Sequence, residues 1–193
     1  MSKAILISIR PKWCELIAGG TKTIEVRKTA PKIETPFKCY IYCTKPSFPH
    51  EDFLVFDAGK NKVKAFYGGG KVIGEFVCDY IERYATFYST NYAAFYMKEE
   101  NEGLILDIDF GATCLTEDDF FAYGNGNDLF GWHISELKIY DKPKKLSDFV
   151  RPCCERVSDC GSCPKFDRNA FSCKRNNTVK RPSQSWMYVE ELS

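Results

Sequence analysis

The sequence lacks long apolar runs and a large excess of charge of either sign. No segment approaches the roughly 18–20 apolar residues of a membrane-spanning helix, and Met1 is not followed by the pattern of a secretory signal. The 27 Lys and Arg residues balance 26 Asp and Glu residues to a net charge of +1, so the whole chain is not a strongly basic nucleic-acid binder. We therefore expect a cytoplasmic protein without a membrane partner.

The charge is, however, unevenly distributed along the chain. Residues 97–128 hold nine acidic residues against one lysine, whereas residues 142–182 hold eleven Lys and Arg residues against four acidic ones. Such a distribution allows a basic face that binds a polyanion. The alternative is that both segments form ordinary solvated faces.

The pattern of apolar residues predicts an α+β fold. Residues 3–9 are rich in Ile and Leu and predict a central strand that is buried on both faces. Pro11 is suited to the first turn of a helix, on which Trp13, Leu16 and Ile17 share a face. Gly19 and Gly20 end that helix through a left-handed cap, and residues 21–28 form the next strand. Further along the chain, residues 52–66 are expected to be irregular with one short strand. Thr116, followed by three acidic residues, predicts a helix start, and residues 132–140 predict a strand.

Ten cysteines without an export signal indicate a reducing compartment, where thiols are buried, reactive or bound to metal. Five of them are scattered, at Cys14, Cys39, Cys43, Cys78 and Cys114. These we expect to be small buried hydrophobic residues. The other five fall within 21 residues, from Cys153 to Cys173, and indicate a site.

The clustered cysteines predict a structural zinc site, because tetrahedral zinc takes four thiolate or imidazole ligands. The expected ligands are Cys154, Cys160, Cys163 and Cys173, with Cys153 as the substitute for Cys154. The segment has few apolar residues, so a bound metal would contribute to its folding. An iron–sulfur cluster is an alternative cofactor, and disulfides or free thiols are another.

Residues 20–27, Gly-Thr-Lys-Thr-Ile-Glu-Val-Arg, match the pattern G-x-K-x-x-E-x-R. This pattern resembles that of the ASCH family, a branch of the PUA-like superfamily. Further matches are residues 7–11, 74–77 and 131–135, and the closing residues 181–189 resemble the tail of small prophage-type members. The resemblance covers roughly residues 3–150 and 181–192.

The resemblance implies a PUA-like mixed β-barrel with short helices at its ends, interrupted by a small Cys-rich metal-binding insertion. We expect the barrel in residues 1–150, the cysteine module in 151–180, and a strand in 181–193 that returns to the barrel. The resemblance also implies RNA or nucleotide binding in a cleft lined by the motif. Some small bacterial members are amidohydrolases on acylated cytidine, in which a Thr and a Lys of this segment take part; Lys22 matches that Lys, but Glu25 replaces the Thr.

The motif itself offers two cations and one carboxylate. Glu25 and Arg27 lie two residues apart on a strand, so they share a face and can pair, with the carboxylate holding the guanidinium for a phosphate. Lys22 adds a point charge. The alternative is a solvated strand face with an ordinary ion pair.

Other residues complete the predicted site. Arg10 belongs to the same expected nucleic-acid-binding surface, and Trp13 and Trp132 offer rings on which a base could stack. Glu75 is a candidate base or partner of Lys22, although an exposed strand glutamate is the simpler interpretation. His133 is a candidate titrating group or a packed histidine.

Three hypotheses follow. The first is an RNA- or nucleotide-binding protein with a structural zinc site. The second is a hydrolase, either a ribonuclease or an amidohydrolase on modified nucleosides, that uses Lys22 with Glu25 or Glu75. The third is a phage-derived scaffold that binds another protein. Fold-level analogy does not separate these hypotheses, so the sequence leaves open whether the protein is an enzyme.

Overall fold

The computed structural model describes residues 2–48, 50–59, 62–88, 94–100, 103–105, 107–152, 166–167, 169, 172–173 and 177–192. Most of the predicted cysteine module falls outside these residues. The described part is mainly β-structure with few short helices, as the α+β class predicts. Among the described residues, no helix has the length and apolarity to cross a bilayer.

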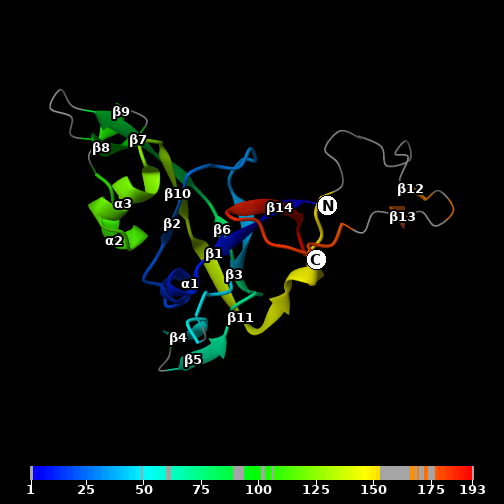
Figure 1. Cartoon of the computed structure of the whole chain (residues 1–193). Coiled ribbons are helices and arrows are strands. Elements are labelled where there is room, and N and C mark those ends of the chain that lie inside the picture. The colour runs from blue at the N-terminus through cyan, green and yellow to red at the C-terminus, as the bar shows by residue number, and fades with distance from the viewer. Residues whose placement is uncertain are drawn as a thin grey trace.

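Two five-stranded sheets form the body of the molecule (Figure 1). The first contains, in spatial order, β11 (Ser135–Lys145), β6 (Lys71–Cys78), β3 (Phe37–Cys43), β1 (Lys3–Ile9) and β14 (Trp186–Glu190). The second contains β2 (Ile24–Arg27), β10 (Leu129–His133), β7 (Ile81–Tyr88), β8 (Ala94–Glu100) and β9 (Gly103–Ile105). Two-stranded pairs are formed by β4 (Phe53–Asp57) with β5 (Val63–Tyr67), and by β12 (Phe166–Asp167) with β13 (Ser172–Cys173).

The two sheets are connected by chain segments that pass almost directly from one to the other. β6 in the first sheet is followed closely by β7 in the second, and β10 in the second sheet by β11 in the first. Each of these two segments therefore contributes one strand to each sheet. The sequence predicted a single strand from Trp132 to Tyr140, whereas the strand is interrupted at Ile134, between β10 and β11. The N–H of Ile134 donates to the Thr23 carbonyl. Most of the described strands thus group into two five-stranded sheets, and the closed barrel stays a prediction.

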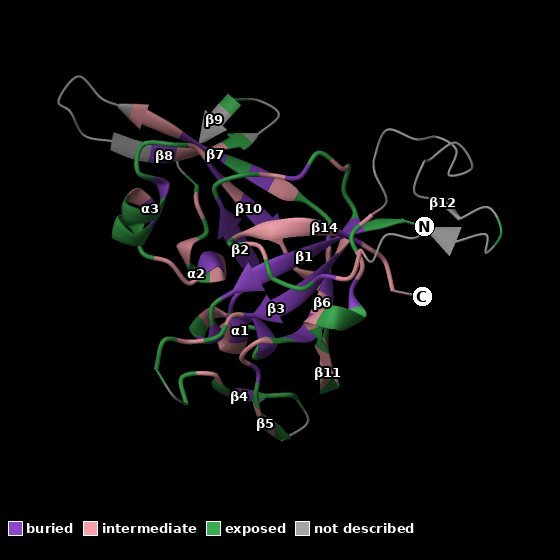
Figure 2. Cartoon of the chain, turned by 45° about the vertical axis from the view of Figure 1, so that its right-hand side comes forward, coloured by how far each residue is buried: buried purple, intermediate pink, exposed green. Residues whose placement is uncertain are grey.

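β1 lies inside the first sheet, between β3 and β14, and its prediction as a strand buried on both faces is confirmed (Figure 2). Ile5 and Ile7 belong to the core between the sheets, while Ala4 and Leu6 belong to a second core on the opposite face. β1 pairs in parallel with β3 and antiparallel with β14. A strand that has a neighbouring strand on each side and a core on each face is expected to have a continuous apolar sequence.

The described helices are short: α1 (Pro11–Ala18), α2 (Phe110–Thr113), α3 (Glu117–Gly124) and the 3₁₀ helix η1 (Leu146–Asp148). The predicted start of α3 is confirmed, because Thr116 caps it through a reciprocal pair of hydrogen bonds with Asp119. In α1 the buried face differs from the prediction. Cys14 and Ile17 are buried, whereas Trp13 and Leu16 stay half-buried.

The end of α1 also differs in detail from the prediction. Gly19 has right-handed backbone angles, and Gly20 has the left-handed φ of 75° that glycine adopts without strain. The tight exit is held by the N–H groups of Thr21 and Lys22, which both donate to the Leu16 carbonyl. This turn delivers Lys22 and β2 to the second sheet.

Candidate functional site

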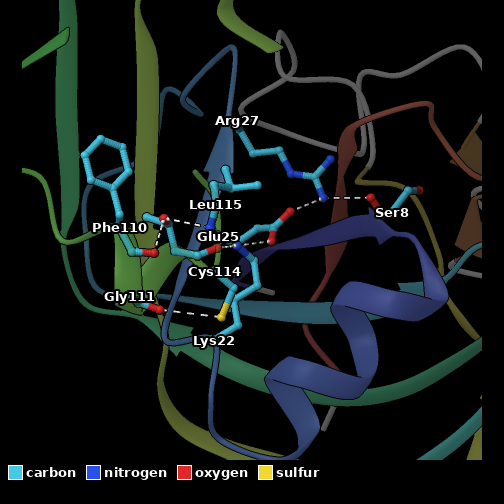
Figure 3. Close-up of polar contacts among 9 residues, drawn as sticks. Ser8, Lys22, Glu25, Arg27, Phe110, Gly111, Cys114 and Leu115 are labelled. Atoms are coloured by element: carbon cyan, nitrogen blue, oxygen red, sulfur yellow. Dashed lines mark hydrogen bonds and ion pairs between the residues drawn. The ribbon is translucent and has the colours of Figure 1, made fainter. Parts of the chain in front are cut away.

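The predicted motif forms a compact network of buried charges (Figure 3). Glu25 Oε1 lies 2.9 Å from Arg27 Nη2, and Glu25 Oε2 lies 3.6 Å from Lys22 Nζ. The prediction that Glu25 and Arg27 share a face and pair is therefore confirmed. The alternative of a solvated strand face is wrong, because Lys22, Glu25 and Arg27 are 2%, 5% and 7% exposed.

Backbone carbonyls from two distant segments complete the network. Arg27 Nη2 donates to the Ser8 carbonyl at 2.7 Å, at the end of β1, and Lys22 Nζ donates to the Thr113 carbonyl at the end of α2. The Thr23 N–H donates to the Ala112 carbonyl and keeps α2 against this segment. The network thus depends on β1 and α2 as well as on its own strand.

Among the described residues, the buried network carries one uncompensated positive charge, since two cations share a single carboxylate. Burial lowers the pKa of Lys22, an effect that the Glu25 carboxylate opposes. Burial raises the pKa of Cys14 and Cys39, the two thiols that interact electrostatically with Arg27, so both stay neutral and add no negative charge. Arg27 Nε has no hydrogen-bond acceptor among the described residues.

Exposed cations and two rings surround this network. Trp13 is half-buried, and its ring centroid lies 4.7 Å from Lys12 Nζ and 5.1 Å from Lys22 Nζ. Lys28 Nζ lies 5.2 Å from the ring centroid of Tyr123, which is 37% exposed. Arg10, a predicted contact residue, is exposed at the start of α1.

Trp132 lies in the core, which does not fit the stacking role predicted for it. Its side chain is fully buried, with its ring 5.7 Å from that of Phe37 and 5.9 Å from that of Trp186. β10 runs between β2 and β7, so a side chain on the face toward the first sheet is enclosed. Trp132 Nε1 has no hydrogen-bond acceptor in the described part of the chain.

Glu75 is not brought to Lys22. Its carboxylate accepts a hydrogen bond from Tyr140 and lies 4.0 Å from Lys38 Nζ. It stands opposite Tyr40 on β3, and Tyr40 belongs to the core on the face away from Trp13 and α1. The register between β3 and β6 could not be derived from the sequence, so Glu75 could not be assigned to a face of the sheet.

A second polar cluster, centred on Glu82, was missed by the sequence analysis. Glu82 Oε1 lies 2.8 Å from Lys98 Nζ and 3.0 Å from His133 Nε2, and Glu82 Oε2 accepts a 2.6 Å hydrogen bond from Tyr84. Burial raises the pKa of Glu82, but the contacts with His133, Lys98 and Tyr84 outweigh it and bring the pKa to about 2. The signal in the sequence was the alternation that places Glu82 and Tyr84 on one face of a strand.

Gly131 makes room for this cluster. A Cβ atom at this position would lie 2.5 Å from the Tyr84 hydroxyl oxygen and 2.9 Å from Ile24 Cγ2. The close approach of Tyr84 to the backbone therefore requires glycine.

Among the scattered cysteines that the structure describes, Cys114 departs from the predicted burial. Cys14, Cys39, Cys43 and Cys78 are fully buried, as expected, but Cys114 is partly exposed. It adopts a left-handed φ of 53° directly after α2, and its Sγ lies 3.5 Å from the Gly111 carbonyl oxygen.

The predicted metal ligands cannot be placed. Cys153, Cys154, Cys160 and Cys163 lie outside the described residues. The backbone of Cys173 lies in β13, but its side chain is outside the described part. Among the side chains that are described, no group of three or more His, Cys, Asp or Glu residues could hold a metal ion. The zinc site and the iron–sulfur alternative both stay predictions.

No protein-family model matches the sequence, and no curated protein matches it. Among solved structures, the ASCH protein of Zymomonas mobilis aligns at 18% identity over 74% of this chain and 73% of that chain, with a TM-score of 0.46. Two single-residue variants of that protein align similarly. The first aligns at 18% identity over 75% of this chain and 77% of that chain, with a TM-score of 0.47. The second aligns at 17% identity over 74% of each chain, with a TM-score of 0.44. Similarity at this level identifies neither a ligand nor a reaction.

Proposed function

We propose that this chain is an ASCH-type protein of the PUA-like superfamily that binds RNA or a nucleotide at the Lys22–Glu25–Arg27 network. The observation that carries the proposal is the excess positive charge of that network. A buried charge without a counter-charge is costly, and an anion that reaches it relieves that cost. Phosphate suits a site built on arginine and lysine.

The surroundings of the network support a phosphate-bearing ligand. Arg10, Lys12 and Lys28 are exposed and would attract a polyanion to this side of the molecule. Trp13 and Tyr123 keep part of their rings accessible and could stack on a base. Trp132 has no such role in the proposal, because its ring is buried.

Binding is favoured over hydrolysis because none of the three charged side chains of the network is a hydroxyl nucleophile. Glu25 stands where the hydrolytic relatives keep their threonine, and its carboxylate pairs with both Lys22 and Arg27. One observation favours the hydrolase as the second candidate. Burial lowers the pKa of Lys22, as is common for lysines that transfer protons in catalysis. Turnover of RNA or of an acylated cytidine that Lys22→Met abolishes would establish this second function.

The zinc site belongs to the proposal on sequence grounds alone. Cys154, Cys160, Cys163 and Cys173 would hold a structural zinc ion, with Cys153 as the substitute for Cys154, in a basic module that extends the binding surface. Metal analysis of protein purified without added zinc tests this point. About one zinc ion per chain is expected from the four-ligand set, whereas iron at that level would assign a cluster and no metal would refute the site.

Fluorescence anisotropy with a labelled single-stranded RNA tests binding at the network. The affinity of the wild type should fall steeply as salt rises, because bound phosphates release counterions. In Lys22→Met/Arg27→Met the affinity should drop at low salt, and the salt slope should decrease by about one to two.

The matched control is Lys38→Met/Arg83→Met. It also removes one lysine and one arginine, both of which are ion-paired with carboxylates away from the network. This control should bind like the wild type. Circular dichroism is used to check that both variants are folded. Arg27→Lys, which keeps the positive charge, is a milder variant. If the Lys22/Arg27 variant bound RNA as tightly as the control, the network would not be the binding site.

A further inference from the structure

Four buried side-chain atoms lack a hydrogen-bond partner in the described part of the chain. Two of them are Thr86 Oγ1 and His133 Nε2, and the latter lies 3.0 Å from Glu82 Oε1. The other two are the N–H donors Arg27 Nε and Trp132 Nε1. Arg27 is 7% exposed and Trp132 is 0% exposed. A buried donor without a partner loses its hydrogen bond to water and gains nothing in return, so native proteins rarely leave one. Two such donors close together therefore indicate an acceptor that the described chain does not supply.

Both donors belong to the same face of the second sheet. β10 pairs antiparallel with β2, with Trp132 opposite Glu25 and Phe130 opposite Arg27. Residues that stand opposite each other share a face, so Arg27 and Trp132 are diagonal neighbours, whose Cα atoms lie about 7–8 Å apart. Side chains as long as arginine and tryptophan can reach a common group across that separation.

Contacts to the first sheet indicate the same region for both side chains. Arg27 donates to the carbonyl of Ser8, whose own N–H donates to the carbonyl of Ser185. The ring of Trp132 lies 5.9 Å from that of Trp186, the next residue along the chain. Both donors therefore approach the segment at which the C-terminal strand begins.

The charge of this region determines which acceptor fits. Of the carboxylates that the structure describes, Lys22 and Arg27 share only Glu25. The pKa of the thiol of Cys14, which interacts electrostatically with Glu25 and Arg27, is raised by burial. A neutral acceptor would satisfy the two N–H donors but leave the excess positive charge. An anionic group with at least two oxygens satisfies both requirements.

We infer that Arg27 Nε and Trp132 Nε1 form a donor pair that receives a terminal phosphate group, either of a mononucleotide or of an RNA end. This inference rests on the proposed function and narrows its ligand. A phosphodiester within a chain carries a nucleoside on both sides, which obstructs its approach to donors this deeply buried. A phosphate monoester carries one substituent and presents three oxygens to the pair.

Titration calorimetry tests the inference with four probes: a nucleoside 5′-monophosphate, the same nucleoside, and one RNA oligonucleotide with and without a 5′-phosphate. The wild type should prefer each phosphorylated probe over its unphosphorylated counterpart. Trp132→Phe keeps an aromatic ring but removes the donor, and it should reduce this preference roughly tenfold or more, the cost of one hydrogen bond to a charged group. The two pairs of probes distinguish a free nucleotide from an RNA end.

The matched control is Trp186→Phe, which removes an indole N–H that already donates to Thr29 Oγ1 at 3.0 Å. It should retain the preference for the phosphorylated probes. NMR of the indole N–H groups adds a direct readout. The resonance that Trp132→Phe abolishes should shift downfield when the monophosphate is added, and the resonance of Trp186 should not.

Two outcomes would overturn the donor pair and leave the proposed function intact. The first is RNA binding that depends on Lys22 and Arg27 but ignores the terminal phosphate. The second is a preference for the phosphorylated probes that is unchanged in Trp132→Phe, together with an indole resonance of Trp132 that does not shift. That result would mean that only an internal water molecule accepts from Trp132 Nε1. Failure of all four probes to bind would instead overturn the proposed function, and the inference with it.

Discussion

Replacing Glu25 by glutamine would remove the one carboxylate that pairs with Lys22 and Arg27 in the described part of the chain. The two cations would then remain buried without a counter-charge. Removing one partner of a buried ion pair typically costs about 3–5 kcal/mol, because the remaining charge is uncompensated. Since small proteins are stable by only about 5–15 kcal/mol, the variant should be severely destabilised.

The excess charge of the network predicts that the two partners of this ion pair are not equivalent. Arg27→Met removes one cation and leaves Lys22 paired with Glu25, so no net charge stays buried. Its cost should be about 1–3 kcal/mol, chiefly from the Ser8 carbonyl that loses a donor. Glu25→Gln should therefore be the more damaging of the two changes.

Urea unfolding, followed by tryptophan fluorescence, measures both costs. With a slope of about 2 kcal/mol per molar urea, Glu25→Gln should lower the midpoint by about 2 M. The control is Glu99→Gln, because Glu99 pairs with Arg83 on the surface and such pairs contribute about 1 kcal/mol or less. Equal costs for Arg27→Met and Glu25→Gln, or a Glu25→Gln cost no larger than that of Glu99→Gln, would refute the argument from excess charge.

Three further predictions concern the surroundings of the network. The pKa of Glu82 is lowered from 4.5 to about 2, so its ionised form should add about 3 kcal/mol to the free energy of unfolding above pH 4.5, and this contribution is lost as the pH falls toward 2. Glu82→Gln should remove this contribution, so the free energy of unfolding measured by urea titration should decrease less steeply at acid pH. Gly131→Ala should lower the melting temperature by roughly 3–10 °C, since the added methyl group displaces Tyr84, whereas Gly19→Ala, with no contact closer than 3.4 Å, should change it little. Iodoacetamide should alkylate Cys114 in the native protein before the four buried thiols of the core, as judged by peptide mass spectrometry; equal protection of all five would contradict the exposure found for it.

The sequence was most informative where short-range physics decides the outcome. The continuous apolar run of β1 predicted burial on both faces, and Thr116 before three acidic residues predicted the start of α3. The spacing of Glu25 and Arg27 predicted their pairing, because residues two apart on a strand share a face. Each of these features depends on neighbours within a few positions.

Long-range packing decided where the sequence analysis went wrong or was silent. Trp132 was expected at the surface, but the sheet order encloses it between β2 and β7. Glu75 was a candidate partner of Lys22, but its register with β3 places it on the other face of the first sheet. The region from Asp52 to Phe66 was expected to be irregular with one short strand, whereas it belongs largely to the β4–β5 hairpin.

By itself, the sequence determined which charges the candidate site contains and that two of them share a face. Only the tertiary structure decided that those charges are buried, that Ser8 and Thr113 supply their carbonyl partners, and that the described residues leave one positive charge without compensation. The physical reason is that burial and charge balance depend on segments up to 91 residues away along the chain, such as Thr113 beside Lys22. Residue spacing alone does not encode which of these segments meet.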